Sequence, residues 1–208
     1  NLSFDQRTPS LVAELARSAG GRTTASYPDS SWPSLAVPGT LDPPPKGGPA
    51  SAWYRLHFKV PVDWLNGGEI LKFGALGYLG DVWLNGQYLG YHEGARTPFA
   101  FDVARYLGFG SDNVLAIHVS SPPPGVRDDI VPWGLIDWWN YGGLTQPVWL
   151  EETPAVAIAR ADGTPHLGGG DGSLVAGDRS WVGAQPSTLA ALPRAGGPRT
   201  ARTSRARR

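Results

Sequence analysis

Aromatic side chains surround one carboxylate in the second half of the sequence. The cluster consists of Trp133, Asp137, Trp138, Trp139, Asn140 and Tyr141. A carboxylate can accept hydrogen bonds from neighbouring hydroxyl groups, and aromatic rings offer flat apolar platforms that suit the faces of pyranose rings. These residue types therefore suit a polyhydroxyl ligand. Taken alone, however, they favour a more ordinary interpretation, in which Asp137 caps a turn and most of the rings are buried.

Within this cluster, the residues differ in what they are expected to do. Trp133 and Trp138 are the best candidates for a ring that faces a ligand. Asn140 either holds the loop in place or contacts the ligand. The following Gly142 and Gly143 are expected to allow a close approach of two backbone segments before the last strand.

Other reactive residue types show no spacing that is typical of a catalytic or metal site. The four histidines, His57, His92, His118 and His166, have no zinc-ligand spacing, and the chain has no cysteine. His92 and Glu93 follow a hairpin and are a weak candidate for an ion or ligand site at the rim of the domain. Neither a Gly-rich phosphate loop nor a serine-nucleophile elbow is present. We therefore expect no metal and no cofactor.

The elements that must position the cluster are expected to be short strands. In residues 53–60, apolar and polar side chains alternate, which is typical of a half-buried strand. Asn85-Gly86 joins strands 81–84 and 87–91 and predicts a type I′ hairpin, since both residue types tolerate positive φ. Further strands are expected at 69–76, 99–103, 114–120 and 147–152.

Many short strands without a long helix between them predict an antiparallel sandwich or jelly roll. The expected fold class is therefore all-β. A short helix over 11–19 is expected before the strands, with Ser10 as its N-cap. Asp102 is expected to cap the turn that follows strand 99–103, and Arg55 is expected to pair with a carboxylate.

Composition divides the chain into a body and a tail. Hydrophobic residues make up 41% of the sequence, as in a globular protein. The body is mildly acidic, which argues against binding to nucleic acid. No apolar run approaches the roughly 20 residues of a membrane span, so no membrane partner is expected. The sequence starts at Asn1 without Met, and we expect its true start to be missing or processed away.

The tail, residues 156–208, is rich in Gly, Ala, Pro and Arg and cannot bury much apolar surface, so disorder is expected. Two origins remain open. The tail is either a natural basic segment that binds anionic surfaces or the out-of-frame translation of a GC-rich gene. The chain has three lysines against fifteen arginines, which fits a GC-rich source.

A series of short motifs in fixed order resembles the N-terminal domain of glycoside hydrolase family 2, the β-galactosidase, β-glucuronidase and β-mannosidase group. The motifs are Trp53-Tyr54-Arg55, Val82-Trp83-Leu84-Asn85-Gly86, Thr97-Pro98-Phe99, Phe101-Asp102-Val103, Asn113-Val114-Leu115 and the segment from Asp137 to Leu144. Each motif is weak alone, but their order and spacing together are specific. The resemblance covers roughly residues 30–155.

The resemblance implies a galactose-binding-like jelly roll at 30–155. Residues 1–29 are weakly patterned and are expected to form a weakly ordered extension before it. It implies that the domain frames a sugar pocket without performing the chemistry, and that Asp137 hydrogen-bonds a sugar hydroxyl. The expected substrate-binding residues are Trp133, Asp137, Trp138, Asn140 and Tyr141. The partners it implies are a terminal β-linked carbohydrate and a catalytic barrel.

No catalytic residue is expected in this chain. Glycoside hydrolysis needs two carboxyl groups about 5–9.5 Å apart across the bond. Glu151 and Glu152 are neighbours on a strand and point to opposite faces, and Asp128-Asp129 lies in a Pro/Gly-rich loop where both can be solvated. A (β/α)₈ barrel typically needs about 250 residues, which the sequence after Pro154 cannot supply.

The sequence therefore predicts a domain of a glycosidase that does not itself turn over substrate. Two alternatives remain. The first is a free-standing carbohydrate-binding module with its own exposed aromatic platform. The second is an interaction domain that packs on a barrel and has no sugar affinity alone. The kind of sugar, the oligomeric state and the compartment do not follow from the sequence.

Overall fold

The computed structural model describes residues 8–41, 50–65, 67–131 and 140–154, and six short strands after residue 160. Helices and strands of the body are α1 (Pro9–Ser18), β1 (Ser34–Leu35), β2 (Ala50–Lys59), η2 (Val62–Trp64), β3 (Gly68–Phe73), β4 (Leu79–Leu84), β5 (Gln87–Glu93), β6 (Phe99–Asp102), η3 (Ala104–Tyr106), β7 (Asp112–Ser121) and β8 (Val148–Thr153). The strands expected from the sequence are all present, with ends shifted by at most three residues.

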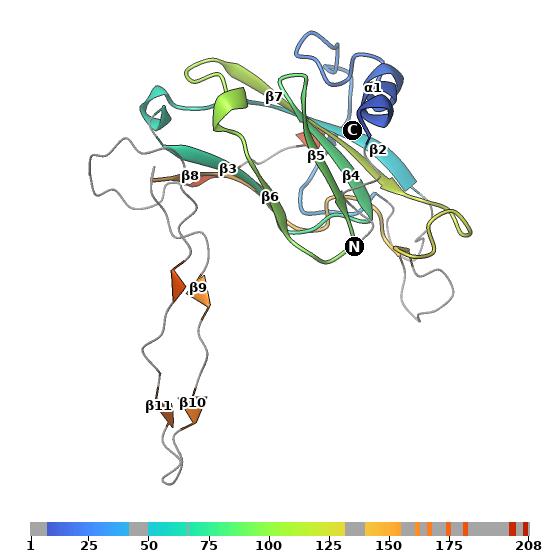
Figure 1. The fold of residues 1–208 in the computed structure, drawn as a ribbon. Coiled ribbons are helices and arrows are strands. Elements are labelled where there is room, and N and C mark those ends of the chain that lie inside the picture. Colours follow the sequence, from blue (N-terminus) through green and yellow to red (C-terminus); the bar gives the residue numbers. More distant parts are fainter. Residues whose placement is uncertain are drawn as a thin grey trace.

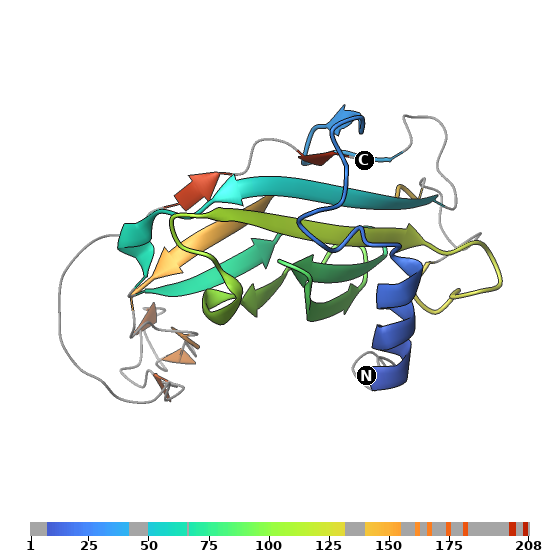
Figure 2. The ribbon, with the colours of Figure 1, turned by 90° about the horizontal axis from the view of Figure 1, so that it is seen from above.

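Two antiparallel sheets form the body (Figure 1). The larger has the order β1-β14-β2-β7-β4-β5 and the smaller the order β13-β8-β3-β6, where β13 (Thr200–Arg202) and β14 (Ala206–Arg207) belong to the tail. Figure 2 shows the long strands β2 and β7 side by side, with β3 and β8 in the other layer. The expectation of an all-β sandwich is confirmed.

The core fills the space between the two sheets, where apolar side chains from both inner faces meet. Tyr54 from β2, Val82 from β4 and Ile117 from β7 are buried on one side, and Leu71 and Phe73 from β3 on the other. Leu115 and Val119 of β7 are also in this core, as the alternation in 114–120 predicts.

The Asn85-Gly86 hairpin between β4 and β5 is confirmed. Both residues have positive φ, 52° and 83°, as a type I′ turn requires. The Asn85 side chain has a further role, because its Nδ2 donates to Oδ1 of Asn113 at 2.8 Å while its Oδ1 accepts from the amide of Val114. The turn is thereby tied to the start of β7.

The N-terminal helix begins earlier than expected. Pro9 occupies its first turn and Thr8 is the N-cap, with its Oγ1 accepting from the amide of Leu11 at 3.3 Å. The prediction of Ser10 as the cap was wrong, because proline fits the first helical position and leaves the preceding threonine to cap. Figure 1 shows α1 beside the six-stranded sheet.

In the tail, the structure describes β9 (Ala161–Asp162), β10 (His166–Leu167), β11 (Leu174–Val175), β12 (Trp181–Val182), β13 (Thr200–Arg202) and β14 (Ala206–Arg207). β13 pairs with β8, and β14 pairs with β1 and β2. Most of 156–208 lies outside the described residues, so its expected disorder remains a prediction. Among the described residues, no helix is long and apolar enough to cross a membrane.

Candidate functional site

The segment that follows the aromatic cluster is held against the start of β4 by two glycines. Gly77 and Gly143 exchange two backbone hydrogen bonds, of 2.9 and 3.1 Å. A Cβ on Gly77 would lie 2.6 Å from the carbonyl oxygen of Tyr141, and Gly143 has φ +122°. Only glycine allows this approach and this backbone conformation. The expected close contact of backbones at Gly142-Gly143 is confirmed.

The backbone at residues 39–41 also hydrogen-bonds to the residues that follow the aromatic cluster. The amide of Gly39 donates to the carbonyl of Leu144 at 2.8 Å, and the amide of Leu41 donates to that of Gly142 at 2.9 Å. Leu144 is itself in the core. The stretch that follows the aromatic cluster is therefore fixed by chain segments that lie far apart in sequence.

Asn140, the first residue of the aromatic cluster that the structure describes, is anchored by Tyr78. The Tyr78 hydroxyl donates to Oδ1 of Asn140 at 2.5 Å, and both side chains are buried. Burial raises the pKa of Tyr78, and the charge of Arg96 opposes this only in part, so the phenol stays protonated and keeps donating.

The chain that enters the cluster is also anchored. Val131 is fully buried, and its amide donates to the carbonyl of Arg127 at 3.0 Å. Arg127 binds both carboxylate oxygens of Glu93, at 3.1 and 3.2 Å, and both oxygens of Asp129 at 2.8 Å. The hydrogen bonds that Arg127 donates to Asp129, and then those to Glu93, raise the pKa of Arg127, which is charged throughout the physiological range.

Of the five expected substrate-binding residues, the structure describes Asn140 and Tyr141. Asn140 is buried and hydrogen-bonded, as one of its two expected roles requires, and Tyr141 is partly exposed. Trp133, Asp137 and Trp138 lie outside the described residues. Their sugar contact therefore stays a prediction.

Several other expectations can be compared with the contacts. Asp102 accepts from the amide of Ala104 at 3.3 Å, so its capping role is confirmed.

His92 stacks on Phe99 with ring centroids 4.1 Å apart, and its Nε2 lies 3.0 Å from Oγ1 of Thr97. Burial lowers the pKa of His92. Among the described residues, no group of three metal-ligating side chains could hold an ion.

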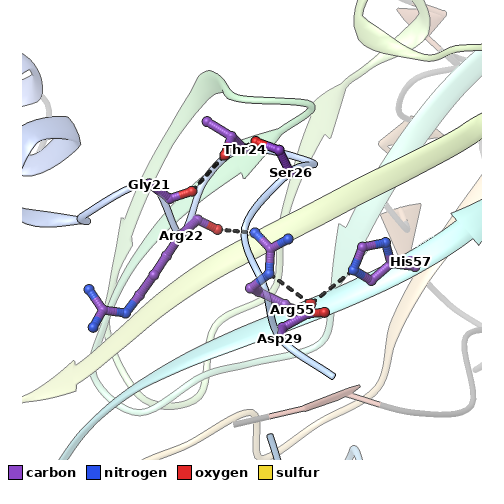
Figure 3. Close-up of polar contacts among 7 residues, drawn as sticks. All are labelled: Gly21, Arg22, Thr24, Ser26, Asp29, Arg55 and His57. Atoms are coloured by element: carbon purple, nitrogen blue, oxygen red, sulfur yellow. Dashed lines mark hydrogen bonds and ion pairs between the residues drawn. The ribbon is translucent and has the colours of Figure 1, made fainter. Parts of the chain in front are cut away.

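Arg55 lies in a polar cluster on the outer face of the six-stranded sheet (Figure 3). Its Nε donates to Oδ2 of Asp29 at 2.9 Å, its Nη1 donates to the carbonyl of Arg22, and Nε2 of His57 lies 2.9 Å from the same Asp29 oxygen. The Tyr27 ring lies 5.4 Å from its guanidinium. The expectation that Arg55 pairs with a carboxylate is confirmed.

The burial of Arg55 differs from what the alternation of residues 53–60 predicts. Residues 53–60 alternate as if their polar face were open to water, yet Arg55 is 1% exposed. The N-terminal segment that carries Arg22 and Asp29 covers this part of the sheet. Burial alone would raise the pKa of Asp29, but the hydrogen bonds from Arg55 and His57 outweigh it and lower that pKa.

None of the adjacent carboxylate pairs is placed as a catalytic pair. Glu151 accepts from Nζ of Lys72 at 3.0 Å and from the Trp149 indole at 3.3 Å. Asp128 accepts from the amide of Gly125 at 2.8 Å. With Asp129 bound to Arg127, three of the four carboxylates in these pairs have local structural partners.

Sequence reasoning missed the role of Tyr78. The sequence feature that could have indicated this role is an aromatic residue placed between Gly77 and the first strand of the hairpin. That signal is weak without the fold, because the partner Asn140 lies 62 residues away. The contact of Arg127 with Glu93 was also missed, because the two residues lie 34 positions apart.

The sequence of this chain is similar to a known family and to known proteins. The family model described as glycosyl hydrolases family 2, sugar binding domain, matches residues 24–154, more than half of the chain. A β-galactosidase of Thermoanaerobacter pseudethanolicus is 35% identical over 102 residues, which is 48% of this chain and 13% of that protein. A β-glucuronidase of Formosa agariphila is 27% identical over 142 residues, or 60% of this chain and 14% of that protein.

Solved structures agree with these matches. The β-glucuronidase of Bacteroides uniformis superposes with a TM-score of 0.56 at 28% identity, over 65% of this chain and 16% of that one. The Ruminococcus gnavus β-glucuronidase shares the fold with a TM-score of 0.59 at 22% identity, over 76% of this chain and 29% of that one. The chain spans only a small part of the relatives it matches. The chain therefore belongs to glycosyl hydrolase family 2, and residues 24–154 are its sugar-binding domain.

Proposed function

We propose that this chain acts within a glycosidase that releases a terminal β-linked sugar, such as a β-galactosidase or β-glucuronidase, and that it shapes the sugar pocket. The family match at residues 24–154 carries the proposal. Hydrolysis itself is assigned to a catalytic barrel, because the described residues form two packed sheets, and Asp128, Asp129 and Glu151 of the two adjacent carboxylate pairs are bound to structural partners.

Asp137 is the proposed sugar contact, with Trp138 and Trp133 as aromatic platforms and Tyr141 beside them. The support is the anchoring of the chain on both sides of this segment. Val131 and Asn140 are buried and hydrogen-bonded at its two ends, so the eight residues between them start and finish at fixed points. Fixed end points reduce the entropy that a segment loses when it binds a ligand.

The proposal is tested in a chimaeric enzyme in which residues 24–154 replace the matching segment of the Thermoanaerobacter pseudethanolicus β-galactosidase. We expect hydrolysis of β-galactosides to be retained. Asp137→Asn should raise KM about 10- to 100-fold, which corresponds to the loss of one hydrogen bond to a charged group. The matched control is Asp112→Asn, whose carboxylate is exposed and lies 3.7 Å from Lys59.

Two outcomes would contradict the proposal. If Asp137→Asn and Asp112→Asn have the same small effect on KM, Asp137 does not contact the sugar. If the 208-residue chain alone binds a β-galactoside at millimolar concentration and loses binding on Trp138→Ala, the chain is a free-standing carbohydrate-binding module.

A further inference from the structure

Glu69, near the start of β3, is a buried carboxylate without a partner in the part of the chain that the structure describes. The residue is 0% exposed, and neither Oε1 nor Oε2 has a hydrogen-bond partner there. The described ion pairs do not include it either. An ionised carboxylate that is buried without a partner is costly, so such a group normally carries a proton or holds a cation.

A second carboxylate belongs to the same place. Glu152 on β8 is directly opposite Glu69 in the antiparallel register of β3 and β8, which are neighbours in the smaller sheet (Figure 1). Residues opposite each other share one face of a sheet, with Cβ atoms about 4.5–5.5 Å apart. Burial, and then the charge of Glu152, raises the pKa of Glu69. Two like charges at this spacing oppose each other's ionisation unless a positive charge joins them.

Gly67, just before β3, brings a third oxygen atom to the two carboxylates. A Cβ on Gly67 would lie 3.2 Å from Oε1 of Glu69 and 3.0 Å from the carbonyl oxygen of Thr153. The same position is 2.9 Å from Cγ of Glu152. Gly67 is not among the glycines with positive φ, so its backbone conformation does not require glycine. Glycine is needed here because oxygen ligands and the Glu152 side chain converge where a Cβ would lie.

Burial and ligand type together select the class of partner. Both oxygens of Glu69 are inaccessible to solvent, so a lysine or arginine side chain of another domain cannot reach them, whereas a small ion can. Gly67 and Glu152 are partly exposed, which gives an ion a route from solvent. Carboxylate and carbonyl oxygens are ligands that Ca²⁺ prefers, and Ca²⁺ tolerates irregular coordination completed by water, whereas Mg²⁺ demands a near-ideal octahedron.

We propose that Glu69, Glu152 and the carbonyl oxygen of Thr153 form a Ca²⁺ site that links β3 to β8. The site uses two acidic side chains and one backbone oxygen, and so differs from the groups of three metal-ligating side chains that the described residues lack. β8 ends at Thr153, and the family match ends at residue 154. The ion would therefore fix the end of the sugar-binding domain, and no sugar contact enters the inference.

The first test is calcium binding by the full 208-residue chain after treatment with EDTA. Titration with CaCl₂ in a calorimeter should show one ion per chain, with a dissociation constant on the order of 10⁻⁴–10⁻³ M, as for sites with few charged ligands. Thermal unfolding in 10 mM CaCl₂ should give a Tm about 3–10 °C higher than in EDTA, because the ion binds the folded chain. MgCl₂ at the same concentration should raise Tm less.

Variants then locate the ion. Glu69→Gln and Glu152→Gln each remove one charged ligand, so each should weaken Ca²⁺ binding at least about tenfold. Gly67→Ala keeps both carboxylates and should also weaken binding, because its Cβ occupies the point on which the ligands converge. The matched control is Glu151→Gln, whose carboxylate accepts from Nζ of Lys72 at 3.0 Å on the opposite face of the sheet. It should bind Ca²⁺ as the unmodified chain does.

Stability should show a reversal of order. In EDTA, Glu69→Gln should have a higher Tm than the unmodified chain, because an unpartnered carboxylate is removed; in 10 mM CaCl₂ it should have the lower Tm. No heat of binding and no change of Tm up to 10 mM CaCl₂ would overturn the inference and leave Glu69 as a buried, protonated acid. Binding that survives both Glu69→Gln and Glu152→Gln would also overturn it, because the ion would then lie elsewhere. If Glu69→Gln fails to fold, Glu152→Gln and Gly67→Ala decide the question.

Discussion

Arg55 and Glu69 are both buried charged residues, on strands of the two different sheets, and their surroundings differ. Arg55 is 1% exposed and contacts Asp29, the carbonyl of Arg22 and the ring of Tyr27. Glu69 on β3 is 0% exposed, and neither of its carboxylate oxygens has a hydrogen-bond partner among the described residues.

The neighbours of Glu69 add to the difference. Glu69 shares the inner face of β3 with Leu71 and Phe73 and lies opposite Glu152 in the register of β3 and β8. Burial, followed by the negative charge of Glu152, raises the pKa of Glu69. The buried charge on the outer face of one sheet thus has hydrogen-bond partners, whereas burial of the Glu69 charge at the end of the other sheet costs stability.

The largest effect is expected at the paired charge. Arg55→Met keeps most of the side-chain volume but leaves the largely buried Asp29 without its main partner, so the free energy of unfolding should fall by about 3 kcal/mol. Urea denaturation followed by tryptophan fluorescence measures the change. Asp29→Asn together with Arg55→Met should cost less than Arg55→Met alone. Equal or larger loss in the double variant would mean that Asp29 carries no cost once Arg55 is removed.

A smaller and opposite effect is expected at the unpaired charge. Glu69→Gln should increase the free energy of unfolding by about 1 kcal/mol near pH 7, because an unpartnered carboxylate no longer has to be buried. The folded-state pKa of Glu69 is raised, so its contribution to stability is present at low pH and is lost as pH rises through that pKa. The gain should therefore shrink as pH falls and vanish once Glu69 is protonated in both the folded and the unfolded chain.

Glu151→Gln is the matched control for this pH dependence. Hydrogen bonds from Lys72 lower the pKa of Glu151, so its contribution is present at neutral pH and is lost as pH falls. The two variants should thus differ in sign near neutral pH. Glu69→Gln that destabilises the chain at pH 7 would show that Glu69 has a partner beyond the described residues.

The smallest effect is expected where a charge pair is open to water. Nζ of Lys59 lies 3.7 Å from the Asp112 carboxylate, and the two side chains are 71% and 74% exposed. Lys59→Ala should change the free energy of unfolding by less than about 0.5 kcal/mol, in the same urea titration. A loss as large as that of Arg55→Met would mean that burial does not explain the difference between the two pairs.

The sequence by itself determined the strands and their main turn. Alternation along residues 53–60 and 114–120 is a local property of the backbone, since neighbouring side chains point to opposite faces of a sheet. Asn85-Gly86 is equally local, because its positive φ values follow from the two residue types. The order of these motifs was enough to indicate the family.

The tertiary structure decided which distant residues meet. Alternation marks Arg55 as polar but does not say that a segment some 26 residues upstream covers it and supplies Asp29. Tyr78 and Asn140 lie 62 residues apart, and the pairing of Gly77 with Gly143 brings their neighbouring backbones together. Local propensity acts over a few residues, whereas burial and long-range hydrogen bonds depend on how the two sheets pack.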